Sequence, residues 1–243
     1  MKRRSFIKLS SLTGLAITTL PSYSYSILEI DTSELIGKGF PELFGDGFKL
    51  RKEAHDAFLN MKSEALNEDV DIQVVSSYRN FNHQKRIWNR KFKSFTKQGL
   101  TTLGAIQKII EYSTIPGTSR HHWGTDLDIF DGIPVQPENV LLTRHFEGNG
   151  PFRKLKDWMD KNANSFGYYL VYTNNEKRKG FKYEPWHYSY KPLSEIYLKE
   201  FKELDILKTL SNEDIMGKEN FSKEFIQGYI QNNILDINPK LLS

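Results

Sequence analysis

Cysteine is absent from this sequence of 243 residues. Without thiols the chain can form no disulfide, no thiolate metal site and no cysteine nucleophile. Any bound metal ion must therefore be held by histidine and carboxylate side chains. Hydrophobic residues make up 38% and aromatic residues 13% of the chain, which is enough for a packed core and argues against disorder.

Long apolar runs are also scarce. The stretch from Leu9 to Leu20 is interrupted by Ser and Thr and is shorter than the roughly 20 apolar residues that a membrane span needs. It follows a basic start containing Arg3 and Arg4 and precedes a Ser-rich segment, the pattern of an export signal. The Arg3-Arg4 pair resembles the twin-arginine signal. We expect residues 1–26 to direct export to the periplasm, with an ordinary secretory signal or a simple anchor as alternatives and the cleavage site left open.

The chain after the predicted signal carries no formal net charge. The whole sequence has 34 Lys and Arg against 30 Asp and Glu, but four of the basic residues, Lys2, Arg3, Arg4 and Lys8, lie in the predicted signal. The remaining 30 basic residues equal the 30 acidic ones. A neutral chain gives no support to a nucleic-acid partner. We also expect no stable membrane insertion once the signal is removed, and the oligomeric state stays open.

The order of the remaining patterns predicts an α+β fold with a small, mostly antiparallel sheet flanked by helices. Apolar residues at helical spacing predict helices, and alternating or β-branched runs predict strands. The helices are expected at 49–67, 82–98, 102–112 and 151–163, and the strands at 70–76, 125–130, 168–172 and 181–190. We assign residues 27–191 to one domain and 192–243 to a helical C-terminal extension.

The segment 117–130 concentrates two histidines and two aspartates. Polar and apolar residues alternate from Thr125 to Phe130, which places Asp126 and Asp128 on one face of a strand. His121 lies seven residues before Asp128, so a straight strand would put the two on opposite faces. A kink at Gly124 can bring them together.

A second cluster lies in the segment 183–190. His187 is predicted on one face of a strand and Trp186 on the other. Pro185 favours a bend at Glu184, which could turn this carboxylate toward the His187 side. Two histidines and a carboxylate that leave a position free for water are typical of a catalytic zinc site. A neighbouring carboxylate could then act as the base.

The spacings Ser119-x-His121-x6-Asp128 and Glu184-x-Trp186-His187 resemble those of the zinc D-alanyl-D-alanine carboxypeptidases of the vancomycin-resistance and LAS type (peptidase family M15). The resemblance spans about residues 74–190. It implies a fold like that of LAS and hedgehog proteins, one Zn²⁺ ion held by His121, Asp128 and His187, and Glu184 as the catalytic base. The implied substrates are the stem peptides of peptidoglycan.

An earlier motif of the same family is matched by Tyr78-Arg79 with Gln84 five residues later. The resemblance places Arg79 in the substrate pocket, as a catalytic and substrate-binding residue, with Tyr78, Gln84 and Ser119 as further substrate-binding residues. A planar guanidinium suits a carboxylate, so Arg79 could hold the free C-terminus of a peptide. A surface salt bridge is the alternative for Arg79.

Several points stay open in the sequence. His122 adjoins His121, although the spacing favours His121 as the ligand. Asp126 stands where many relatives carry a small apolar residue, so it could be an acceptor for a ligand histidine or alter specificity. D,D-carboxypeptidase activity is expected, with L,D-carboxypeptidase and endopeptidase activity as alternatives. A silent, hedgehog-like zinc module is the alternative from another class, and the role of the residues after Pro192 is open.

Overall fold

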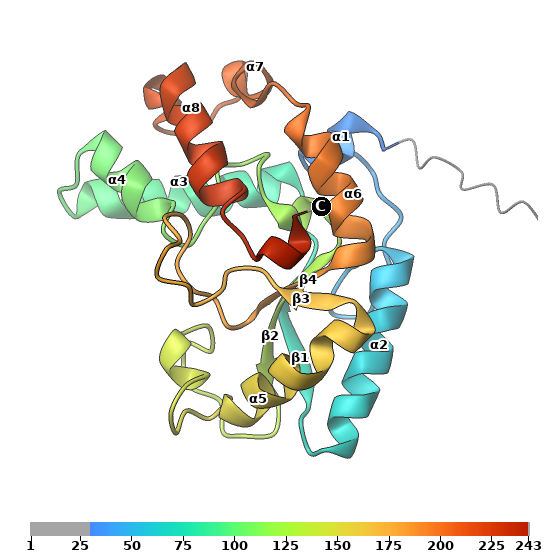
Figure 1. The fold of residues 1–243 in the computed structure, drawn as a ribbon. Helices are drawn as coiled ribbons and strands as arrows, with labels where there is room; N and C mark the ends of the chain where they lie inside the picture. Colours follow the sequence, from blue (N-terminus) through green and yellow to red (C-terminus); the bar gives the residue numbers. More distant parts are fainter. Residues whose placement is uncertain (1–29, 243) are drawn as a thin grey trace, which may run out of the picture.

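The computed structural model describes residues 30–242 and shows a four-stranded antiparallel sheet surrounded by helices (Figure 1). The strands are β1 (Ile72–Ser76), β2 (Asp126–Asp131), β3 (Tyr168–Leu170) and β4 (His187–Tyr190), in the order β1-β2-β4-β3. The α+β prediction is confirmed. The predicted export signal lies outside the described residues.

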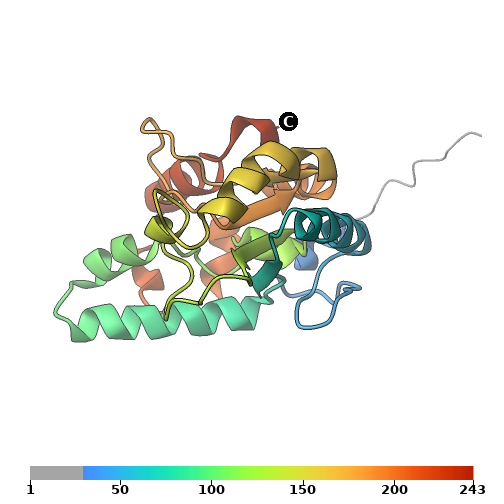
Figure 2. The ribbon, with the colours of Figure 1, turned by 90° about the horizontal axis from the view of Figure 1, so that it is seen from below.

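The three helices predicted before β2 are present, as α2 (Lys52–Asn67), α3 (Phe81–Lys97) and α4 (Thr102–Ile109). The short helix α1 (Thr32–Leu35) was not predicted. Asn80 caps α3 by accepting a hydrogen bond from the His83 amide at 2.8 Å, and Thr101 caps α4 in the same way. Figure 2 shows α3 as the long helix along one edge of the molecule, with α4 beside it.

Helix α5 (Arg153–Asn162) begins later than the sequence predicts, because residues 151–152 form a turn. The strand predicted over 181–190 is shortened to β4. Pro185 cannot donate to a strand ladder, and residues 185–186 form a turn instead.

The C-terminal extension is helical, as predicted, and contains α6 (Lys191–Lys202), α7 (Ile206–Ser211) and α8 (Lys223–Tyr229). Figure 1 shows these helices together at the top of the molecule. Among residues 30–242 no helix combines the length and the apolar character needed to cross a bilayer.

The two faces of the sheet carry different side chains. Leu127 and Ile129 of β2 and Tyr188 of β4 enter an apolar core that includes buried residues of α2 and α5. The opposite face carries Asp126 and Asp128 of β2 and His187 of β4. This division follows from the alternation of side chains along a strand. The polar face of the sheet therefore faces the helices and loops that surround the two histidine clusters.

Candidate metal centre and active site

The register of β2 and β4 brings the two sequence clusters together. Asp128 pairs directly with His187, and Asp126 pairs with Ser189. Cross-strand partners have neighbouring side chains on the same face of the sheet. The third member, His121, lies in a 3₁₀ turn (Arg120–Trp123) that ends at Gly124, whose φ of 70° is left-handed. The predicted kink at Gly124 is therefore present, and it returns the chain into β2.

His121, Asp128 and His187 form a buried group that could hold one metal ion. One ligand atom from each lies within 4.8 Å of the others. His121 Nε2 is 3.3 Å from Asp128 Oδ2, and His187 Nδ1 is 3.7 Å from Asp128 Oδ1. His121 Nε2 and Asp128 Oδ1 have no hydrogen-bond partner among the described residues. Two histidines and one carboxylate with unpaired buried atoms fit a zinc ion with an open position.

The end of β1 fixes the orientation of His121. Its Nδ1 donates to the Ser77 carbonyl at 2.8 Å, which leaves Nε2 directed at Asp128. The Arg79 amide also donates to the His121 carbonyl, at 3.1 Å. Burial, reinforced by the charge of Arg79, lowers the pKa of His121. The imidazole is therefore neutral at pH 7, as a metal ligand must be.

His122 lies outside this group. Its Nε2 accepts a hydrogen bond from the Gly117 amide at 3.1 Å, and its Nδ1 donates to the Arg79 carbonyl. Burial lowers its pKa to about 3, so it is neutral. Both nitrogens are engaged, and His122 holds the loop next to Arg79 in place.

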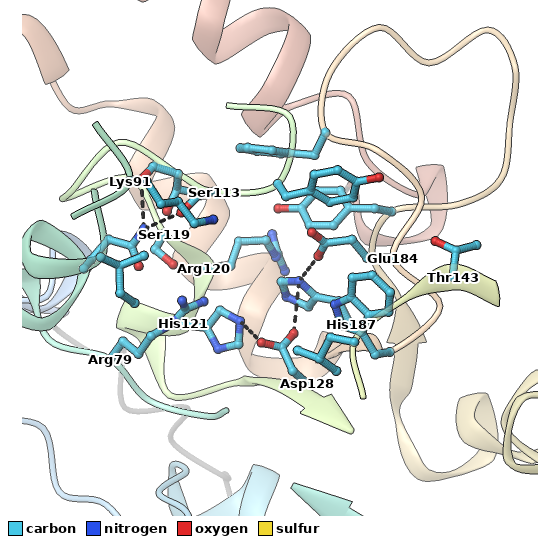
Figure 3. A pocket seen from close by; sticks show the side chains of 18 of the residues that line it. Arg79, Lys91, Ser113, Ser119, Arg120, His121, Asp128, Thr143, Glu184 and His187 are labelled. Atoms are coloured by element: carbon cyan, nitrogen blue, oxygen red, sulfur yellow. Dashed lines mark hydrogen bonds and ion pairs between the residues drawn. The ribbon is translucent and has the colours of Figure 1, made fainter. Parts of the chain in front are cut away.

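Glu184 faces His187 across the site (Figure 3). Its Oε2 is 3.1 Å from His187 Nδ1, so the bend predicted at Pro185 does turn this carboxylate away from the Trp186 face. Burial raises the pKa of Glu184, and the hydrogen bond and charge of His187 oppose that rise. A carboxyl group with a raised pKa beside a metal site is suited to move a proton.

The charge state of His187 is set by the acids around it. Burial alone would lower its pKa, but the hydrogen bonds that the ring donates to Asp126 and Glu184 and the charge of Asp128 raise it to about 10. The metal-free imidazole is therefore protonated at pH 7. Binding of a metal ion must displace a proton from this ring.

These groups open into a cavity of about 370 Å³, within the usual range for small-molecule sites. Its lining includes the predicted residues Arg79, Gln84, Ser119 and Glu184. Arg79 is half-buried, and its Nε is a buried atom with no partner among the described residues. Tyr78 does not line this cavity, so its predicted part in substrate binding finds no support there.

The lining residues that the sequence did not predict include Lys91, Arg120 and Tyr172. Helical spacing could have found Lys91, because Gln84, Ile87 and Lys91 share one face of α3. The loop between β2 and α5, a predicted wall, contributes Leu141, Leu142 and Thr143. No residue described after His187 lines the cavity, so the described part of the C-terminal extension does not narrow the cleft directly.

An α+β fold that places two histidines and one aspartate beside a buried carboxyl group has the donor set of a catalytic metal centre. The comparison with protein families makes this class more specific. A sequence model of VanY, D-alanyl-D-alanine carboxypeptidase, matches residues 47–193. The chain belongs to this family and is a metallo-carboxypeptidase.

Individual relatives agree with this assignment. An uncharacterized protein of Haemophilus influenzae is 34% identical over 107 residues, which cover 43% of this chain and 82% of that protein. A D-alanyl-D-alanine carboxypeptidase of Enterococcus faecalis is 32% identical over 119 residues, or 48% of this chain. The match spans only 39% of the Enterococcus faecalis protein.

Solved structures show the same fold. VanYB in complex with D-alanine-D-alanine superposes with a TM-score of 0.52 at 23% identity, covering 73% of this chain and 92% of VanYB. A VanY mutant from a VanB-type resistance cassette, solved in complex with Zn(II), gives a TM-score of 0.50 at 23% identity, covering 68% and 90% of the two chains. The buried group of this chain is one that could hold a single metal ion.

Proposed function

We propose that this protein is an exported zinc D,D-carboxypeptidase that removes the terminal D-alanine from peptidoglycan stem peptides. The observation that carries the proposal is the cavity that joins the metal group, Glu184 and Arg79 in one space. The complex of VanYB with D-alanine-D-alanine supports the substrate class.

When bound, the zinc ion would polarise the scissile carbonyl and lower the pKa of a water molecule. His121, Asp128 and His187 would hold the ion. Glu184 takes the proton of the attacking water and delivers it to the departing amine. Burial raises its pKa, which makes Glu184 a stronger base for the first transfer than an ordinary glutamate.

Arg79 sits in the same cavity with an unpaired Nε. We propose that its guanidinium binds the C-terminal carboxylate of the peptide, with Ser119 and Gln84 as neighbours. Gln84 is held in place by its amide nitrogen, which donates to the Thr114 carbonyl at 2.9 Å, while its Oε1 lacks a partner among the described residues and is free to accept a hydrogen bond from a peptide N–H. A carboxylate clamp selects the last residue of a chain and favours exopeptidase over endopeptidase cleavage.

A panel of substrates tests the proposal. It contains a pentapeptide ending in D-Ala-D-Ala, the same peptide with an amidated C-terminus, a tetrapeptide whose last bond joins an L-centre to D-Ala, and a cross-linked dimer. Chelator-sensitive release of D-alanine from the free pentapeptide alone is the expected result. Preference for the tetrapeptide would assign L,D-carboxypeptidase activity, and cleavage of the dimer or the amide would assign endopeptidase activity.

Zinc binding without turnover of any of these peptides would favour the silent, hedgehog-like module. The position of Glu184 argues against that outcome, because its carboxylate is 3.1 Å from a predicted metal ligand and faces the cavity. A module that uses zinc only for stability has no need of a free carboxyl group there.

We also propose export by the twin-arginine route, supported by Arg3 and Arg4 in the sequence. Changing both residues to Lys should retain the precursor in the cytoplasm, as measured by fractionation. A matched change of Lys2 and Lys8 to Arg should leave export intact. Unchanged export of the Arg3→Lys, Arg4→Lys variant would contradict this route.

A further inference from the structure

Behind His187, on the side away from the cavity, lies a fully buried carboxylate that the metal group does not include. Asp126 Oδ2 accepts hydrogen bonds from His187 Nε2 and from Arg120 Nε, each at 3.0 Å. Its Oδ1 accepts from the hydroxyls of Ser189 and Thr125, each at 2.7 Å. Both oxygens are therefore saturated, and Asp126 has no capacity left for a metal ion.

Arg120 is the counterion of this carboxylate. The side chains of Arg120 and Asp126 are 2% and 0% exposed, so the two charges are removed from water together. Arg120 Nη2 donates to Ser189 Oγ at 2.8 Å, and the guanidinium lies 4.7 Å from the centre of the Trp123 ring. A buried ion pair of this kind contributes little net stability, since the desolvation of the two charges offsets most of their attraction. Its retention in the interior points to a role besides folding.

The strand register explains how Asp126 reaches His187. Asp128 is the direct partner of His187, whereas Asp126 is the partner of Ser189 and lies diagonally from His187. The His187 ring therefore lies between two carboxylates of the same strand. Asp128 is near Nδ1 and Asp126 is bonded to Nε2. Only one arrangement of the ring satisfies both contacts.

We propose that Arg120, Asp126 and Ser189 form a positioning unit for His187. Asp126 takes the Nε2 hydrogen, which leaves the Nδ1 lone pair for zinc, while Arg120 and Ser189 hold Asp126 in place. The acceptor behind a metal-bound histidine commonly fixes its tautomer and orientation. This inference rests on the zinc site of the proposed function, and not on the substrate or on the role of Arg79.

A set of variants separates positioning from folding, with two measurements on each protein. The first is the zinc dissociation constant from competition with a chromophoric chelator, and the second is the melting temperature of the metal-free protein. Asp126→Ala leaves Arg120 buried without a counterion, so both quantities should worsen. In the double variant Arg120→Met, Asp126→Ala no uncompensated charge remains, so the melting temperature should recover.

The zinc affinity should not recover with it. Loss of an outer partner of a metal ligand weakens binding by about 10- to 100-fold, and we expect the double variant to stay in that range. Asp126→Asn keeps a carbonyl acceptor for Nε2 and should recover most of the affinity. Asp131→Ala is the matched control, because Asp131 is also buried on β2 but bonds only to the amides of Asp71 and Ile133. It should lower the melting temperature and leave zinc affinity unchanged.

Wild-type zinc affinity in a folded double variant would overturn the inference and leave the proposed function standing. Failure of the wild-type protein to bind zinc would instead remove the proposed function. If the double variant does not fold, nitrogen NMR of His187 in zinc-loaded wild-type protein decides the point. Hydrogen on Nε2 and zinc on Nδ1 is expected, and the reverse assignment would overturn the positioning role.

Discussion

The two sides of the His187 ring are built in opposite ways. On the rear side both oxygens of Asp126 are fully hydrogen-bonded, and Arg120 is fixed by Asp126 and Ser189. On the cavity side His121 Nε2, Asp128 Oδ1 and Arg79 Nε have no partner among the described residues. The rear holds a ligand rigidly, and the front leaves atoms free for a metal ion and a substrate.

The difference between the two sides of His187 affects the stability of the metal-free fold. A buried polar atom without a partner costs about 1–3 kcal/mol. The cavity side therefore lowers the stability of the metal-free fold. In the rear network both oxygens of Asp126 are paired, and Arg120 Nη1 is the buried atom that lacks a partner among the described residues. Substitutions on the cavity side should affect binding and catalysis but hardly change folding stability. Substitutions on the rear side should lower both metal binding and folding stability.

The largest effect is expected for Glu184→Gln. Loss of the proton carrier should reduce kcat by about 10³-fold, within the range for general acid-base catalysis. Zinc stoichiometry and melting temperature should hardly change, because the amide fills the same space. Turnover by the zinc-loaded variant measures the loss, and Glu195→Gln, in a half-exposed surface pair with Lys191, is the control. Loss of zinc together with activity would show that Glu184 serves the metal rather than the proton.

A smaller effect is expected for Arg79→Lys. The lysine ammonium is a single point charge and replaces the planar guanidinium, which can bind both oxygens of a carboxylate. This change should lower kcat/KM for the free-acid pentapeptide by about 10- to 100-fold, which corresponds to the loss of one charged hydrogen bond. The ratio between free-acid and amidated peptides measures the clamp and should approach one. Arg86→Lys, on the same region of the chain but outside the main cavity, is the matched control. An unchanged ratio would place the carboxylate elsewhere.

The third prediction concerns pH. The pKa of His187 is raised to about 10, so the metal-free ring carries a proton that zinc must displace. Zinc affinity should therefore rise about tenfold per pH unit between pH 7 and 9, as measured by chelator competition. Because the pKa of His187 is raised in the folded state, its protonated ring stabilises the metal-free protein. This stabilisation is complete below pH 6.5 and is lost as the pH rises through 10. A flat affinity over this interval would contradict the charge state that we assign.

The sequence predicts the front of the site better than the rear. Spacing and resemblance give His121, Asp128, His187 and Glu184, and Gly124 explains the return of the chain into β2. These positions follow from local backbone geometry, which periodicity and a glycine reveal. The bend at Pro185 is local as well, although it shortens β4 more than the alternating pattern indicates.

The sequence offers Asp126 as an acceptor for a ligand histidine, and its contact with His187 bears this out. Which histidine it meets, and the part of Arg120, depend on contacts between distant segments. Arg120 meets Ser189 across 69 residues, and Asp126 meets His187 across 61. These contacts require the register of β2 against β4, which a single sequence does not contain. The same holds for His122, whose exclusion from the metal group depends on its bonds to Gly117 and Arg79.

A crystal structure of the zinc-loaded protein, with anomalous diffraction at the zinc edge, tests the two-sided arrangement most directly. We expect a single anomalous peak at about 2.0–2.2 Å from His121 Nε2, an Asp128 oxygen and His187 Nδ1. His187 Nε2 should still be hydrogen-bonded to Asp126. A peak on His122, or on His187 Nε2 with Asp126 displaced, would contradict it.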